Sequence, residues 1–158
     1  YICEHNESGA MGIIINRPID IELNELLQHL DFSYNSDQTV PVYAGGPVQD
    51  DRGFILHRST TNEWDSSYKI TAELSLTTSM DILQAISENS GPEQFLVALG
   101  YAGWGAGQLE QELSENVWLS CPANLDIIFR TPAEERLQAA AATLGVNLDL
   151  LTSQSGHA

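Results

Sequence analysis

Lysine is almost absent from this chain: Lys69 is the only one, and five arginines make up the rest of the basic residues. Against these 6 basic residues stand 22 acidic ones, which gives a formal net charge of −16. Proteins that bind nucleic acids usually neutralise several phosphates with a basic patch. The charge therefore disfavours direct DNA binding unless the few arginines cluster, and it is otherwise typical of a soluble protein.

Cysteines and long apolar runs are also scarce. Cys3 and Cys121 are the only cysteines, too few for a disulfide framework, which a chain of 158 residues does not need. No apolar run approaches the roughly 18–20 residues that span a bilayer. We therefore expect a cytoplasmic protein with reduced thiols that does not cross a membrane. The chain opens at Tyr1, without Met and already in a strand-like pattern, and we expect that its natural N-terminal segment is missing.

Length and a hydrophobic content of 42% predict a single domain over residues 1–158. Apolar runs and alternation predict strands at 1–3, 11–15, 40–44, 53–58, 69–77, 95–99, 117–121 and 125–129. Helical spacing predicts four helices, which begin near Asp20, Thr78, Gln108 and Thr131. Because strands and helices do not alternate strictly, the pattern favours an α+β fold with a mixed, largely antiparallel sheet flanked by helices.

The glycine-rich segment Gly100–Gly107 lies between a predicted strand and a predicted helix. This placement suits anion binding at a helix N-terminus. However, the dinucleotide-binding pattern needs glycine where Gln108 stands, and a phosphate-binding loop needs lysine followed by serine or threonine. The helix that follows carries three glutamates, which disfavour a phosphate nearby. We therefore interpret the segment as a tight strand-to-helix turn, with anion binding as the alternative.

Histidine and cysteine offer two further candidate sites. Strand alternation places His57 on the face of Ile55, where it could perform acid–base chemistry or simply form hydrogen bonds on the sheet. The second interpretation is favoured because no nucleophile stands at a fixed spacing from it. Cys3 and His5 form at most half of a metal site, which Cys121 or His57 would have to complete, and the paired ligands of zinc sites are missing. We expect no catalytic residue, no cofactor and no metal.

Three long segments stand in a recognisable order: residues 1–18, then 42–57, then 98–110, and the chain closes on Gly156-His157-Ala158. Together they resemble the AlgH/YqgE-like family, and the resemblance covers essentially the whole chain. It implies a bacterial, cytosolic protein with an α+β fold and a mixed sheet. Some members carry the label of transcriptional regulator. Because no activity or cofactor is established for the family, the resemblance assigns no functional residues.

Two hypotheses about function follow. The first is a non-enzymatic binding or regulatory protein that acts through protein partners, since the chain is acidic and shows no catalytic constellation. The alternative is a small-ligand-binding protein or an enzyme whose cleft is built by the three glycine-containing segments. The ligand-binding residues of that cleft would be Asn16, Arg17, Gly45, Gly46, Arg52, His57 and Trp104.

Overall fold

The structure, a computed structural model, describes residues 1–150; the closing Gly156-His157-Ala158, which is part of the family resemblance, lies outside this range. The strands in the described part are β1 (Ile2–Asn6), β2 (Gly9–Gly12), β3 (Pro18–Glu22), β4 (Pro41–Ala44), β5 (Val48–Arg58), β6 (Ser67–Lys69), β7 (Leu74–Thr77) and β8 (Phe95–Gly105). The helices are α1 (Leu23–His29), α2 (Met80–Ser87), α3 (Gln108–Ser114), α4 (Leu125–Phe129) and α5 (Ala133–Ala142).

The strands form one sheet in the order β1-β2-β8-β5-β7-β6, with β4 added beside β8 and β3 beside β4. The first half of β8 lies between β4 and β5, and its second half pairs with β2. Only the pairing of β4 with β8 is parallel among the described strands; the other pairings are antiparallel. The predicted α+β fold with a mixed, largely antiparallel sheet is therefore confirmed.

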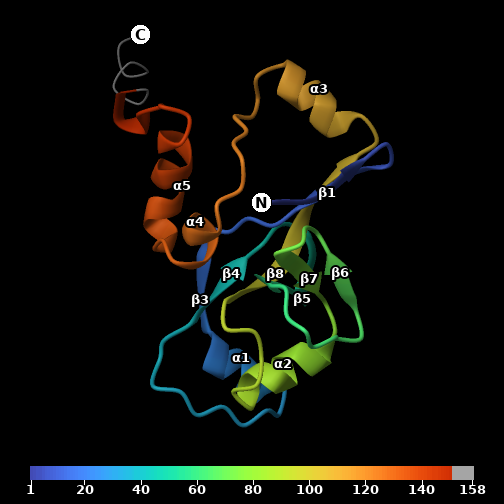
Figure 1. Cartoon of the computed structure of the whole chain (residues 1–158), viewed down its shortest axis with the longest axis vertical. Coiled ribbons are helices and arrows are strands. Elements are labelled where there is room, and N and C mark those ends of the chain that lie inside the picture. Colours follow the sequence, from blue (N-terminus) through green and yellow to red (C-terminus); the bar gives the residue numbers. More distant parts are fainter. Residues whose placement is uncertain (151–158) are drawn as a thin grey trace.

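Two apolar clusters pack on opposite faces of this sheet. Successive residues of β5 divide between them: Phe54 and Leu56 belong to one cluster, and Ile55 belongs to the other. Helices α1 and α2 cover the face of Ile55, where they bury Leu23, Leu27, Ile82, Leu83 and Ile86. Helix α4 covers the other face through Ile128. Figure 1 shows α1 and α2 together at one end of the molecule, away from α3 and α5.

The glycine-rich segment is strand rather than turn over most of its length. Strand β8 continues to Gly105, and its last four residues pair with the whole of β2. Only residues 106 and 107 turn the chain, and Gly107, with φ 75°, is the N-cap of α3. The hairpin of β1 and β2 and the end of β8 thus form a three-stranded ribbon that leads to α3 (Figure 1).

Two predicted strands near the C-terminus are wrong. Leu125–Phe129 is helix α4, because the side chain of Asn124 accepts hydrogen bonds from the backbone N–H groups of Asp126 and Ile127 at 2.9 and 3.2 Å. Residues 117–121 lie in the segment 115–124 that joins α3 to α4, called the linker below. The linker belongs to no helix or strand, as Figure 1 shows.

Several predicted boundaries are also corrected. The strand expected at 69–77 is the β6–β7 hairpin, since the Thr71 hydroxyl oxygen accepts the backbone N–H groups of Glu73 and Leu74 and turns the chain. The strand expected at 11–15 ends at Gly12. The helix N-caps are Glu22, Ser79 and Pro132 rather than Asp20, Thr78 and Thr131.

Candidate functional site

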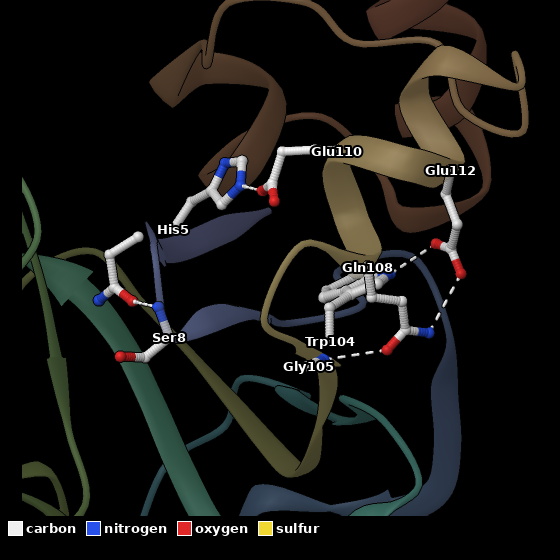
Figure 2. A network of polar contacts seen from close by, with 8 residues as sticks. His5, Ser8, Trp104, Gly105, Gln108, Glu110 and Glu112 are labelled. Atoms are coloured by element: carbon white, nitrogen blue, oxygen red, sulfur yellow. Dashed lines mark hydrogen bonds and ion pairs between the residues drawn. The ribbon is translucent and has the colours of Figure 1, made fainter.

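A cluster of polar and aromatic side chains joins the ribbon, α3 and the linker. The carboxylate of Glu112 on α3 accepts the indole N–H groups of Trp104 from β8 and Trp118 from the linker, both on Oε2, at 2.7 and 2.8 Å. Gln108 donates to the other oxygen at 3.2 Å and accepts the backbone N–H of Gly105 at 2.9 Å. We call Trp104, Gln108, Glu112 and Trp118 the Glu112 cluster; Figure 2 shows all but Trp118.

The Glu112 cluster is anionic at neutral pH. Hydrogen bonds from Trp118, Trp104 and Gln108 hold the pKa of the Glu112 carboxyl below its usual range, in spite of a smaller opposing effect of desolvation. Beside it, the His5 ring contacts the carboxylate of Glu110, which ties β1 to α3 (Figure 2). A phosphate next to the glycine-rich segment would therefore face the ionised carboxylate of Glu112, which opposes the anion-binding interpretation.

The linker leaves the Glu112 cluster with large apolar side chains at the surface. Val117, Trp118 and Leu119 are 57%, 48% and 71% exposed. The N–H of Val117 bonds to the carbonyl of Glu112, but within the described part of the chain the backbone of residues 118–123 has no hydrogen-bond partner. Exposed apolar side chains thus coincide with free backbone donors and acceptors.

The glycine pair Gly45-Gly46 lies against the middle of β8. A Cβ on Gly46 would lie 2.0 Å from the carbonyl carbon of Tyr101, and one on Gly45 would lie 2.4 Å from the carbonyl oxygen of Gly100. The backbone at Gly45-Gly46 therefore lies so close to that of β8 that no side chain fits between them. The two glycines allow this close packing. Next to this contact, the carbonyl of Arg17 accepts the N–H of Ala44 at 2.9 Å.

The polar side chains expected in a cleft have separate surroundings. Asn16 and Arg17 are exposed. Arg52 donates to Gln49 and Thr78 at 3.3 and 3.2 Å, and its guanidinium lies 5.7 Å from the centre of the Phe54 ring.

His57 is buried inside the sheet. The ring bonds through Nδ1 to the carbonyl of Arg58 and through Nε2 to the Thr77 hydroxyl, both at 2.8 Å. Because a carbonyl can only accept, Nδ1 carries the proton and Nε2 accepts from Thr77. The Thr77 oxygen lies 2.7 Å from the hydroxyl of Ser67. Burial lowers the pKa of His57, which the bond to Arg58 offsets in part, so the ring is neutral at neutral pH.

The structure brings some of the seven candidate residues together and separates others. Arg17, Gly45 and Gly46 are neighbours, whereas His57 pairs with Phe95 at the start of β8 and Trp104 lies near its end. Two surface hollows are lined by residues 28 and 31–35 and by residues 34–38, 86, 89, 91–93 and 95. Neither hollow includes any of the seven.

Cys3 and His5 do not belong to a larger ligand cluster in the part of the chain that the structure describes. Residues 1–150 contain no group of three or more His, Cys, Asp or Glu side chains that could hold a metal. Burial raises the pKa of the Cys3 thiol to about 11, so the thiol stays protonated and is a poor metal ligand.

The model of the AlgH-like family (DUF179) matches residues 1–149. The chain belongs to the AlgH-like family. It is 55% identical to a UPF0301 protein of Thioalkalivibrio sulfidiphilus and 52% identical to one of Nitrosococcus oceani, each over 100% of this chain and 85% of the relative.

Solved structures agree with this assignment. The solution structure of the AlgH protein from Pseudomonas aeruginosa is 54% identical, with a TM-score of 0.80 over 100% of this chain and 84% of that one. A crystal structure of a Corynebacterium diphtheriae protein is 19% identical, with a TM-score of 0.63. The match covers 83% of this chain and 68% of that protein's chain, and at this identity it shows only a similar fold. In the described part of this AlgH-like chain, no helix is long and apolar enough to cross a membrane.

Sequence patterns alone do not mark two of the residues that build the site of this AlgH-like chain. Glu112 stands out only as one of three glutamates behind the glycines, and Trp118 only as part of a predicted strand. Gln108 and Glu112 stand four residues apart on α3, where side chains meet on one helix face, and this spacing is the available signal. Nothing in the sequence indicates that the linker returns to that face.

Proposed function

We propose that this AlgH-like chain is a non-enzymatic binding or regulatory protein, and that its protein partner contacts the linker. One observation carries the proposal: three adjacent large apolar side chains are exposed on a segment whose backbone is unpaired from residue 118 to residue 123 in the described structure. Contiguous exposed apolar surface is typical of protein interaction sites. The Glu112 cluster supports this role, because it holds the linker in one place and so lowers the cost of ordering it on binding.

The charges support a protein partner over nucleic acid. With a net charge of −16 the chain repels phosphate backbones. One of its few cations, Arg136, is buried, and Arg52 is held against Phe54 and Thr78. A role in transcription, as the label of some family members suggests, would then act through another protein rather than through direct contact with DNA.

Binding is also supported over catalysis by the chemistry of the best-placed side chains. Both ring nitrogens of His57 are engaged within the sheet, and Glu112 is occupied by three donors. Each group is thus bound to protein atoms rather than directed at a substrate. Both cysteines are free thiols, which supports the cytoplasmic location that we propose with this function.

Site-specific photo-crosslinking in cells tests the proposal. A photoreactive residue at position 119 should give a discrete crosslinked protein, and one at position 137, another exposed leucine on α5, should not. Excess unlabelled chain should compete for the partner, while excess Leu119→Ser should compete at least about tenfold less well. Equal crosslinking from both positions, or equal competition by both proteins, would show that the linker is not the contact site.

A further inference from the structure

We infer that the linker receives an extended, basic and apolar peptide segment of the partner, which adds to residues 117–121 as a β-strand. This inference rests on the proposed function and specifies the chemistry of the partner at the same surface.

The backbone of the linker favours strand addition. Within the described structure, the N–H and C=O groups of residues 118–121 have no partner. An extended peptide can satisfy such groups with main-chain hydrogen bonds, as it does at the edge of a sheet. Val117 and Trp118 are also residue types that are enriched in strands, and Pro122 closes the segment because it has no donor.

One side chain of the linker, Trp118, is held by the rest of the protein. Trp118 points toward α3, because its indole N–H reaches Glu112 and its ring packs against Trp104. In an extended segment the residues on either side of it point the opposite way. Those residues, Val117 and Leu119, are more exposed than Trp118. The apolar residues of an added strand would therefore lie beside Val117 and Leu119, while Trp118 stays anchored.

The charge around the linker selects a basic occupant. Helix α3 and the linker, residues 108–124, contain Glu110, Glu112 and Glu115 and no lysine, arginine or histidine. A second copy of the chain would bring the same negative charges to the contact, which disfavours self-association. Lysine or arginine side chains on the added strand would instead face opposite charge and associate faster.

Peptides of defined composition test this inference with the intact chain. The probes are short fluorescent peptides of equal length: alternating lysine and valine, alternating glutamate and valine, alternating lysine and serine, and the lysine–valine peptide with N-methylated amides. We expect the lysine–valine peptide to bind at least about tenfold more tightly than the other three, measured by fluorescence anisotropy. Hydrogen exchange should slow at the amides of residues 118–121 when it binds.

Variants localise the binding. Leu119→Ser should lower the affinity for the lysine–valine peptide about tenfold. Leu137, another exposed leucine, lies on α5, and Leu137→Ser should leave this affinity unchanged. If the lysine–serine peptide bound as tightly as the lysine–valine peptide, the binding would depend on charge alone. If the N-methylated peptide bound as tightly, main-chain hydrogen bonds would not contribute, and strand addition would be excluded. Concentration-dependent dimers in sedimentation that Leu119→Ser abolishes would identify a second copy as the occupant. Each of these results overturns the inference.

The failure of this inference differs from a failure of the proposed function. If no peptide binds but crosslinking from position 119 still captures a partner that Leu119→Ser cannot compete for, the linker is an interaction site and the partner's chemistry is different. If crosslinking is also independent of the linker, the proposed function fails.

Discussion

The rings of Trp104 and Trp118 meet edge to face, with their centres 5.9 Å apart and an angle of 77° between their planes. One tryptophan lies near the end of the central strand, and the other stands in a segment without secondary structure. They meet because both donate to the same oxygen of Glu112. Since a carboxylate oxygen can accept two such bonds and a ring pair prefers this geometry, hydrogen bonding and packing reinforce each other.

Replacing Glu112 with Gln should release the linker. The neutral amide oxygen accepts two indole donors less strongly than a carboxylate does, so Trp118 should leave Trp104 and become hydrated. We expect tryptophan emission to move to longer wavelength and the amide of Val117, which bonds to the carbonyl of Glu112, to exchange faster. Glu115→Gln is the matched control, because that carboxylate accepts only from Gln111 within the described residues. A variant spectrum identical to that of the control would mean that Glu112 does not hold the linker.

Acid should release the linker of the unmodified chain at a particular pH. Because the pKa of Glu112 is lowered in the folded protein, its stabilising contribution is present above the usual glutamate pKa of about 4.3 and is lost as pH falls through the lowered value. We expect the emission change to have its midpoint below about pH 4.3 and to be missing in Glu112→Gln. A midpoint at or above the usual value would contradict the assigned hydrogen bonds.

The buried His57 should make folding sensitive to mild acid. Its pKa in the folded chain is lowered mainly by burial, so the unfolded chain binds a proton first as pH falls below about 6.5. Stability is thus lost from there down to the folded pKa, by at most about 1.4 kcal/mol per pH unit. His57→Gln should flatten this part of the pH dependence, measured as free energies of unfolding between pH 5 and 8. His29 is exposed, so His29→Gln is the control for this change. If His57→Gln left the slope of the free energy of unfolding against pH unchanged, the assignment of this pH dependence to His57 would be wrong.

Much of the fold was predictable because the spacing of apolar residues along the chain indicates which side chains are buried. The alternation of Phe54, Ile55 and Leu56 correctly divides β5 between two cores, and the family resemblance is confirmed. The errors arose where a single side chain redirects the backbone. Thr71 turns an alternating run into a hairpin, and Asn124 turns a run of strand-forming residues into a helix. Such short-range hydrogen bonds outweigh strand propensity, which is itself set largely by context.

The candidate site was less predictable than the fold. The glycines of residues 100–107 drew attention to the right segment, but Gly100 has a packing reason: a Cβ there would lie 2.2 Å from the carbonyl oxygen of Gly46, so the two glycines let two backbones approach. The side chains that gather beside Trp104 come from α3 and the linker, and neither Glu112 nor Trp118 has a spacing to Trp104 that strand or helix periodicity would mark. The tertiary contacts of a linker cannot be predicted from hydrophobic periodicity, because periodicity describes only one helix or strand at a time.

Arg136 should fix the C-terminal helices to the sheet. Its guanidinium is buried, lies 5.1 Å from the centre of the Tyr43 ring, and donates to the backbone carbonyls of Thr131 and Ile15. Lysine cannot reproduce this fork and stacking, so Arg136→Lys should lower the free energy of unfolding by about 1–3 kcal/mol. Arg130 is the control, because it is exposed and its Nε lies 3.6 Å from Oδ1 of Asp126. Arg130→Lys should lower the free energy of unfolding by less than about 0.5 kcal/mol. Equal losses in denaturant unfolding would show that Arg136 is not such an anchor.

Among the glycines of residues 1–150, Gly46 should be the most sensitive to substitution, for a steric reason. Gly46 lies in the connection between β4 and β5, with φ 155°, and Gly46→Ala would place Cβ 2.0 Å from the carbonyl carbon of Tyr101 in β8. Strand β8 cannot move away without disturbing its pairing with β5. We expect a loss of more than about 3 kcal/mol in the free energy of unfolding, or no soluble protein.

Two other glycines separate the causes of this effect. Gly145 has φ 73° and a Cβ added to it would meet nothing within 4 Å, so Gly145→Ala isolates backbone strain and should cost about 1–2 kcal/mol. At Gly53 the nearest atom would be Ile55 Cδ1 at 3.8 Å, an ordinary contact, and Gly53→Ala should stay within about 1 kcal/mol of the unmodified chain. Denaturant unfolding of the three variants should therefore rank Gly46 far above Gly145, and Gly145 above Gly53. If Gly46→Ala cost no more than Gly145→Ala, the contact with Tyr101 would not constrain the fold, and the glycine pair would regain its place as a candidate for ligand binding.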